Sequence, residues 1–293
     1  MTEDEPLQTL PMRPADSNTP PTFVLPADAC DSHFHVFEQG YPHVPRPHYT
    51  FPDATLDQYV AMADLLGLTR SVLVQPSFYA GDNSLTLDVL RRVGDRVRAV
   101  VQVEEDVSDA TLDEYHELGV RAIRLDLFAR AASPIDEIAA YVGRLAARTR
   151  PRGWHLQFYT PGRVVRDLLP FLAVLDGPFV VDHLGYMTKA EGLTSTDAER
   201  LLAVFEDNPN FWIKLSAPYR IAKDEPLSSV AALGRALVGS GADRLLWGSD
   251  WPHLPDGQRD TGELLNLLAD WAPDPADRQR ILVDGPTRLF WAD

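Results

Sequence analysis

The stretch Asp31-Ser32-His33-Phe34-His35-Val36-Phe37 sets two histidines two residues apart in a run that otherwise has the composition of a β-strand. Alternate side chains of a strand share one face, so we expect His33 and His35 to converge on one small volume. The glycine-rich turn that usually opens a dinucleotide-binding sheet does not follow this run. The stretch therefore favours a barrel over a doubly wound open sheet.

Two later apolar runs also end in an ionisable residue just before a turn marked by Gly or Pro. His183 closes the run Val180-Val181-Asp182-His183-Leu184-Gly185, and Asp250 closes Leu245-Leu246-Trp247-Gly248-Ser249-Asp250. A polar residue at the carboxyl end of a buried strand is where an α/β barrel carries its chemistry. The pattern indicates that these residues meet at one end of such a barrel.

Short apolar runs alternate with amphipathic segments along most of the chain. The strands that we expect are residues 29–37, 70–76, 97–103, 122–127, 154–159, 179–183, 211–216 and 244–250. The helices that we expect are residues 56–66, 84–93, 110–118, 135–147, 164–175, 197–205, 230–238 and 261–271. This order predicts a single (β/α)8 TIM barrel over residues 29–293.

Composition narrows the classes of partner. The formal charge of −16, from 27 Lys and Arg against 43 Asp and Glu, argues against a nucleic-acid or anionic-membrane partner. The one cysteine, Cys30, excludes an intrachain disulfide and favours a cytoplasmic location. Residues 1–28 are rich in proline, and we expect them to form a partly disordered arm. The sequence gives no indication of the oligomeric state.

The histidines and the aspartate suit two chemistries. Imidazoles and a carboxylate can hold Zn²⁺, which acidifies a bound water. Alternatively, imidazoles donate hydrogen bonds to a carbonyl oxygen as it gains charge, and the aspartate takes a proton from water. Residues 156–159, at the end of the fifth expected strand, offer no His, Lys or Glu, and His155 lies at the opposite end of that strand. Hydrogen-bonded core is the structural alternative for His33 and His35.

The chain resembles the amidohydrolase superfamily and, within it, the 2-pyrone-4,6-dicarboxylate lactonases. The resemblance rests on segments that begin with ACDSHFHVF at residues 29–37 and end with ILVDGPTRLFW at 281–291. The segments between them are VLVQPSFYAGDN, GVRAIRLDLFAR, WHLQFY, VVDHLG and LLWGSDWPH. The resemblance implies that the protein is a hydrolase that acts on a carboxylic ester bond and that its substrate is a small lactone.

The resemblance also implies a catalytic set that requires no metal. His33, His35 and His183 would polarise the lactone carbonyl. Asp250 would deprotonate the attacking water and then protonate the leaving oxygen. The same four residues would be the ligands of a Zn²⁺-dependent hydrolase, such as a sulfomuconolactone hydrolase, or of a decarboxylase on this barrel. A non-catalytic small-molecule binding barrel is the alternative from another class.

Substrate contacts are implied at six further positions. These are Arg124, Arg130, Arg220, Tyr49, Tyr159 and Ser77. Arg124 lies in an apolar strand, where a guanidinium needs an anionic partner, which could be Asp126 or the substrate. The other two arginines could instead be exposed to solvent, and the tyrosines could be packing residues. The Ser77 hydroxyl could instead have the ordinary role of a turn residue.

The chain departs from the lactonase pattern near the expected anion site. Tyr186 stands where an arginine is usual, and Phe78-Tyr79 stands where a Cys-His pair is usual. Asp126 adds an acid close to Arg124. These differences favour a substrate with fewer or different anionic groups than pyrone dicarboxylate. A muconolactone or a sulfonated muconolactone is the kind of substrate that we expect.

Overall fold

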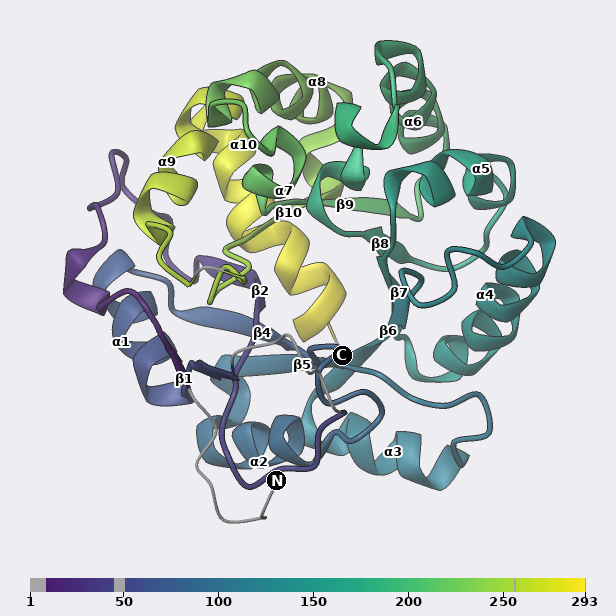
Figure 1. Ribbon diagram of the computed structural model, residues 1–293, viewed down its shortest axis with the longest axis horizontal. Helices are drawn as coiled ribbons and strands as arrows, with labels where there is room; N and C mark the ends of the chain where they lie inside the picture. The colour runs from purple at the N-terminus through teal and green to yellow at the C-terminus, as the bar shows by residue number, and fades with distance from the viewer. Residues whose placement is uncertain (1–8, 45–50, 256, 293) are drawn as a thin grey trace.

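The computed structural model describes residues 9–44, 51–255 and 257–292. Within them a parallel sheet of eight strands forms the centre, with helices around its outside (Figure 1). The strands, in the order of the sheet, are β2 (Cys30–Phe34), β4 (Arg70–Val74), β5 (Val97–Val101), β6 (Val120–Asp126), β7 (His155–Tyr159), β8 (Phe179–Val181), β9 (Phe211–Ser216) and β10 (Leu245–Gly248).

The last strand closes the sheet against the first. The Asp250 N–H donates to the His33 carbonyl oxygen at 2.8 Å, and the His35 N–H donates to the Trp251 carbonyl oxygen at 2.8 Å. Phe34 and Trp251 form a parallel bridge. The predicted single (β/α)8 barrel is therefore confirmed, because the open-sheet alternative would leave these two edges apart.

The structure describes ten α-helices, of which eight follow the predicted positions and two short ones, residues 218–222 and 275–279, were not predicted. The helices are α1 (Leu56–Leu66), α2 (Ser84–Val93), α3 (Asp109–Leu118), α4 (Ile135–Thr149), α5 (Gly162–Leu172), α6 (Ser195–Asp207), α7 (Pro218–Ala222), α8 (Ala231–Gly241), α9 (Thr261–Trp271) and α10 (Pro275–Gln279). Local signals set several ends: a capping box of Thr55 and Gln58 starts α1, and Gly67 ends it with φ 82°. None of the described helices is both long and apolar enough to cross a membrane.

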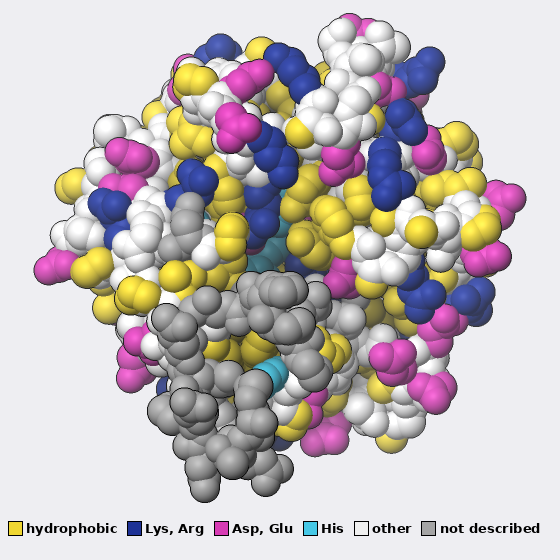
Figure 2. Space-filling view, viewed as in Figure 1, with side chains coloured by type: hydrophobic (Ala, Val, Ile, Leu, Met, Phe, Trp, Pro, Cys, Tyr) yellow, Lys and Arg dark blue, Asp and Glu magenta, His cyan; other side chains and the backbone are white. Residues whose placement is uncertain are grey.

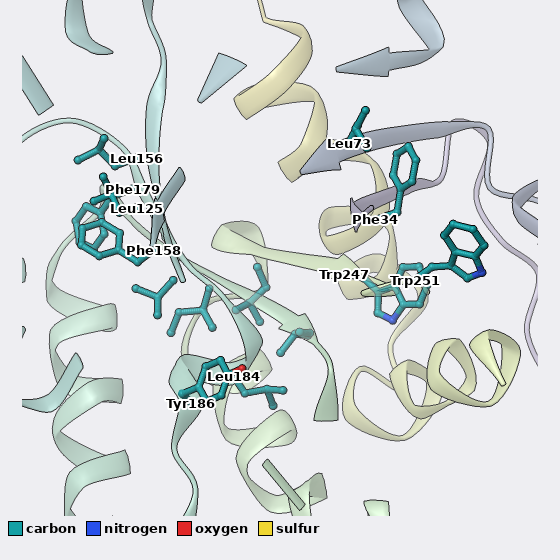
Figure 3. Close-up of a cluster of buried hydrophobic side chains, with 14 of the residues drawn as sticks. Phe34, Leu73, Leu125, Leu156, Phe158, Phe179, Leu184, Tyr186, Trp247 and Trp251 are labelled. Carbon is teal, nitrogen blue, oxygen red and sulfur yellow. The ribbon is translucent and has the colours of Figure 1, made fainter. Parts of the chain in front are cut away.

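Outward-facing side chains of the strands pack against the helices. Leu125, Phe158 and Phe179, from three neighbouring strands, gather in one buried cluster (Figure 3). Inside the barrel, Leu289 and Phe290 of the C-terminal segment η9 (Thr287–Trp291) join a second cluster that contains inward-facing residues of the strands. The C-terminal segment therefore fills the barrel interior beneath the polar residues.

The described part of the proline-rich N-terminal arm, residues 9–28, lies against the barrel. The short strand β1 (Thr9–Pro11) pairs in parallel with β3 (Phe51–Asp53). The Thr19 N–H and hydroxyl donate to the carboxylate of Asp260, which also accepts a hydrogen bond from Arg13. These contacts dock the arm at the start of α9, in the region of the chain where we expected partial disorder.

Candidate active site

The four residues that were expected to converge lie together at the carboxyl ends of the strands. The ring centroid of His33 is 5.0 Å from that of His35 and 5.0 Å from that of His183. The Asp250 Oδ1 atom lies 3.6 Å from the Nε2 atoms of His33 and His35, and 3.8 Å from that of His183. One carboxylate oxygen therefore faces three imidazole nitrogens.

Strained backbone positions aim two of these side chains into the barrel mouth. His183 and Asp250 adopt left-handed conformations with φ of 55° and 59°. Residues other than glycine seldom adopt this conformation, which costs about 1–3 kcal/mol and is characteristic of functional sites. Each residue lies two positions after the last residue of its strand, β8 or β10, so the left-handed turn redirects its side chain at the carboxyl end of the barrel.

The second oxygen of Asp250 is held by two neighbours from α7. The Tyr219 hydroxyl donates to Oδ2 at 2.5 Å, and the Arg220 Nε donates to it at 2.9 Å. Oδ1 is buried and has no hydrogen-bond partner among the described residues. Burial opposes ionisation of Asp250, but the charge of the Arg220 guanidinium outweighs it and holds the pKa of the carboxyl well below its usual range.

The imidazoles are anchored through their Nδ1 atoms. His35 Nδ1 lies 2.7 Å from the Val74 carbonyl oxygen, and His183 Nδ1 lies 2.8 Å from the Ser216 hydroxyl. Burial lowers the pKa of His183 to about 4 and also lowers the pKa values of His33 and His35. The histidines are therefore neutral at physiological pH, and their Nε2 atoms face Asp250.

A buried polar layer supports the site from below, and sequence reasoning missed it. The Lys214 Nζ atom donates to Gln157 Oε1 at 2.8 Å, and Gln157 Nε2 donates to Asp182 Oδ2 at 3.1 Å. All three side chains are fully buried. The available signal was the charge of Lys214 within the otherwise apolar run Phe211-Trp212-Ile213-Lys214-Leu215, since a buried ammonium requires specific partners.

A cavity of about 520 Å³ opens above this cluster; His35, His183 and Asp250 line it, whereas His33 is fully buried behind them and is not part of the lining. Figure 2 shows the cavity as a hollow in this face, with His and Lys or Arg side chains at its floor. Its lining combines ionisable and aromatic residues: His35, Phe37, Pro76, Ser77, Phe78, Arg124, Asp126, Phe128, Ala129, Tyr159, His183, Arg220, Asp250, Leu254 and Pro255. Such a volume suits a small molecule.

Arg124 and Tyr159 form one wall of the cavity. The Arg124 guanidinium lies over the Tyr159 ring, 4.4 Å from its centroid, and donates to the Gln75 carbonyl oxygen at 2.5 Å. Its buried Nε atom has no hydrogen-bond partner among the described residues. The expected alternative partner, Asp126, instead accepts a hydrogen bond from the Ser77 hydroxyl at 2.6 Å. A buried cation with an unused donor indicates an anionic ligand.

Two expected substrate contacts are not found in the described cavity lining. Arg130 is exposed, and its guanidinium lies 4.0 Å from the centre of the Tyr141 ring, outside the lining. The connection after β6 places this side chain against Tyr141 of α4 and not in the cavity lining, so its contact with substrate stays a prediction. Tyr49 lies outside the described residues.

The spacing of the donor atoms would also suit a zinc ion. The donor atoms of His33, His35 and Asp250 lie within 4.8 Å of one another, as do those of His33, Asp182 and His183. Zinc takes about four N or O ligands at about 2.0–2.2 Å. Two ligand atoms of one zinc ion therefore lie only a few ångströms from each other, as these donor atoms do. The number and spacing of the donors therefore fit the metal, provided that each Nε2 atom presents a lone pair.

Comparison with known proteins decides the family. A family model described as amidohydrolase matches residues 30–291. The chain belongs to the amidohydrolase family. A 2-pyrone-4,6-dicarboxylate hydrolase of Comamonas testosteroni is 34% identical over 288 residues, which cover 93% of this chain and 93% of the relative. The predicted family resemblance is confirmed.

Two further proteins extend the comparison of this amidohydrolase. A 4-sulfomuconolactone hydrolase of Hydrogenophaga intermedia is 34% identical, covering 92% of this chain and 91% of the relative. A crystal structure of an Agrobacterium tumefaciens protein is similar with a TM-score of 0.82 and 26% identity, covering 94% of this chain and 98% of that one. The amidohydrolase barrel thus accounts for nearly the whole chain.

Proposed function

We propose that this amidohydrolase opens a small anionic lactone by attack of a water molecule that Asp250 activates, without a tightly bound metal. One observation carries the proposal: a buried carboxylate oxygen with no hydrogen-bond partner among the described residues faces three neutral imidazoles at the floor of a cavity. Relatives named as hydrolases of 2-pyrone-4,6-dicarboxylate and of 4-sulfomuconolactone support the same reaction class.

The chemistry follows from these positions. Asp250 Oδ1 accepts a proton from water as the water oxygen attacks the lactone carbonyl carbon. An imidazole N–H donates to the carbonyl oxygen as it becomes negative. When the ring C–O bond breaks, the protonated Asp250 returns the proton to the leaving oxygen, so that the carboxylate is restored. Tyr219 and Arg220 hold the other carboxylate oxygen, which keeps Oδ1 aimed at the water.

The charges of the cavity favour a lactone with one acidic group. Arg220 is already paired with Asp250, with its Nη2 atom 2.9 Å from Oδ2. Asp126 adds a negative charge to the lining, which leaves Arg124 as the described lining cation without an acidic partner. A second substrate carboxylate would meet Asp126 or the Arg220–Asp250 pair. The substrate that fits best is therefore a monoanionic lactone such as muconolactone.

Initial rates with three lactones would test the proposed substrate class. We expect the highest kcat/KM for muconolactone, a lower value for 4-sulfomuconolactone, and the lowest for 2-pyrone-4,6-dicarboxylate. Ultraviolet absorbance follows ring opening in each case. Failure to open any lactone would overturn the proposed function, whereas a preference for a dianionic substrate would overturn only the charge argument.

The part played by metal is tested on the same preparation. Metal content per chain is measured by elemental mass spectrometry on protein purified without chelator, and lactone hydrolysis is measured before and after chelation. We expect near-zero metal and chelator-resistant activity. About one zinc per chain, with activity lost on chelation, would instead assign the histidines and Asp250 to the metal.

Asp250→Asn should remove the base while preserving the cavity. Asparagine has nearly the shape of aspartate but cannot take a proton from water, so kcat should fall about 10²–10⁴-fold. Binding of the unreacted lactone, measured by calorimetry, should persist because Arg124 is untouched. Asp126→Asn is the matched control: it removes a carboxylate from the cavity wall without removing the base. Turnover by Asp250→Asn at the wild-type rate would contradict the mechanism.

A further inference from the structure

The buried Lys214 meets three acceptors with its three N–H groups. Its Nζ atom lies 2.7 Å from the Ser32 carbonyl oxygen, 2.8 Å from Gln157 Oε1 and 3.3 Å from His33 Nδ1. Strand β9 aims this side chain into the barrel, where its exposed fraction is 0%. An ammonium can only donate hydrogen bonds, so the nitrogen of His33 that faces it must present a lone pair.

Asp182 stands close enough to His33 to favour the opposite arrangement. Its Oδ1 atom lies 3.4 Å from the same His33 Nδ1, but outside hydrogen-bond geometry, and has no hydrogen-bond partner among the described residues. A carboxylate would require the hydrogen on Nδ1, whereas the ammonium requires it on Nε2. The hydrogen bond that is formed is the one to Lys214.

His35 is anchored in the reverse sense. Its Nδ1 atom lies 2.7 Å from the Val74 carbonyl oxygen, which can only accept a hydrogen bond. The hydrogen of neutral His35 is therefore on Nδ1, and its Nε2 presents a lone pair towards the cavity. The two histidines of the sequence pair thus present different chemistry to Asp250.

We propose that Lys214 is a positioning residue that fixes the ring tautomer of His33, so that His33 donates from Nε2 while His35 accepts at Nε2. Asp250 Oδ1 and His35 Nε2, 3.6 Å apart, can then accept the two hydrogens of one water molecule. His33 Nε2–H, 3.6 Å from Oδ1 and buried behind the cavity lining, then directs its hydrogen at the Asp250 carboxylate. This division of roles rests on the proposed hydrolysis, whereas the tautomer of His33 does not.

The same contact works against metal binding by His33. A zinc ligand needs a lone pair on Nε2, and so needs the hydrogen on Nδ1, where Asp182 would accept it. Lys214 holds the ring in the other tautomer. Lys214→Met should therefore move the hydrogen to Nδ1 and complete a zinc site from His33, His35 and Asp250.

Nitrogen NMR of the wild-type protein, labelled with ¹⁵N-histidine, tests the proposal directly. We expect His33 to carry its hydrogen on Nε2 and His35 to carry its hydrogen on Nδ1, with the His33 signals assigned by their loss in His33→Asn. A wild-type His33 with its hydrogen on Nδ1 would overturn the proposal, whatever the outcome of any lactone assay.

Variants then identify the group that sets the tautomer. In Lys214→Met the His33 hydrogen should move to Nδ1, zinc uptake should rise towards one per chain, and kcat should fall about 10²–10³-fold with a smaller change in KM. Lys214→Arg should restore the wild-type tautomer. Lys189→Met, which removes an 85% exposed ammonium, is the matched control and should change none of these quantities.

Asp182→Asn provides a readout even if Lys214→Met does not fold. Because Lys214 and not Asp182 determines the tautomer of the His33 ring, His33 should keep its hydrogen on Nε2 in this variant. A shift of the hydrogen in Asp182→Asn, or an unchanged His33 in folded Lys214→Met, would show that Lys214 does not control the ring.

Discussion

At the scale of single residues, the site depends on how Asp250 and the imidazoles share their hydrogens. Arg220 and Tyr219 use one oxygen of Asp250, which leaves the other directed at His33 and His35. This second oxygen is buried and belongs to an ionised carboxylate, for which a water molecule would be the ordinary hydrogen-bond donor. Such a group is ready to accept a proton from a nucleophilic water.

The pH dependence of the reaction should reflect these neutral imidazoles. Burial lowers the pKa of His183 to about 4, from an ordinary value of 6.5, and lowers the pKa of His35 as well. As pH falls, the imidazoles charge only below 6.5, and Asp250 remains ionised to lower pH still. The acid limb of kcat/KM should therefore lie well below pH 6.5.

Initial rates measured in overlapping buffers from about pH 3.5 to 8 would locate this limb. Circular dichroism at each pH separates loss of activity from unfolding. An acid midpoint at or above 6.5 in folded protein would show that an ordinary exposed histidine governs the reaction.

At the scale of elements, the seam between β2 and β10 positions the site. Gly248 of β10 lies so close to β2 that a Cβ atom there would come within 2.6 Å of His33 Cβ and 3.0 Å of its backbone nitrogen. The absence of a side chain at this position allows the strands to close with the His33 carbonyl oxygen bonded to the Asp250 N–H. The seam therefore aligns the histidine with the aspartate.

Gly248→Ala should misalign these two residues. The added methyl group must displace β2 or β10, which should cost about 1–3 kcal/mol of stability and about 10²-fold in kcat. Denaturant unfolding and steady-state kinetics measure the two effects. Gly239→Ala, in α8, where a Cβ would meet no atom within 4 Å, is the matched control and should keep full activity. Wild-type kinetics in Gly248→Ala would show that the seam tolerates displacement.

His155, at the amino end of β7, links stability to pH. It is fully buried against Phe290 with ring centroids 4.8 Å apart, and neither ring nitrogen has a hydrogen-bond partner among the described residues. Burial lowers the pKa of His155 to about 3, from an ordinary value of 6.5. Between these values the unfolded chain binds a proton that the folded barrel rejects, so stability falls as pH falls from 6.5.

The contribution of His155 should be about 2 kcal/mol between pH 6.5 and 5, because each unit corresponds to about 1.4 kcal/mol. The free energy of unfolding, measured with urea at both pH values, should fall by about 2 kcal/mol less in His155→Leu than in the wild type. His43→Gln, which replaces an exposed imidazole, should leave the loss unchanged. An equal loss in His155→Leu and wild type would place the pH sensitivity elsewhere.

At the scale of the whole molecule, the protein carries a charge of −16 while its cavity presents Arg124 to an anion. The long-range field repels an anionic lactone, and the local guanidinium attracts it. Salt screens distant exposed charges more than buried ones, with a Debye length of about 30 Å at 0.01 M and about 8 Å at 0.15 M. The two effects can therefore be separated by ionic strength.

We expect kcat/KM for an anionic lactone to rise when salt is increased from about 0.01 M to 0.15 M, because the repulsive field is screened first. A neutral lactone of similar size serves as the control and should show no such rise. A fall in kcat/KM for the anionic lactone would mean that the local positive charge at the mouth outweighs the net charge of the molecule.

The sequence by itself determined the barrel and most of the site. Alternating apolar runs and amphipathic helices follow from the periods of strands and helices, which are local properties of the chain. The histidine pair, His183 and Asp250 could be placed together because the carboxyl ends of parallel strands meet at one end of a barrel. Several helices, such as residues 56–66 and 261–271, have the boundaries that the pattern predicted.

Only the tertiary structure decided which groups meet each other inside that frame. The placement of Arg130 on Tyr141, and the pairing of Asp126 with Ser77 in place of Arg124, depend on loop paths that carry no local period. The contact of Lys214 with His33 joins residues that are 181 positions apart. Its existence depends on closure of the barrel, because hydrogen-bond direction is a property of atoms brought together in space and not of neighbours along the chain.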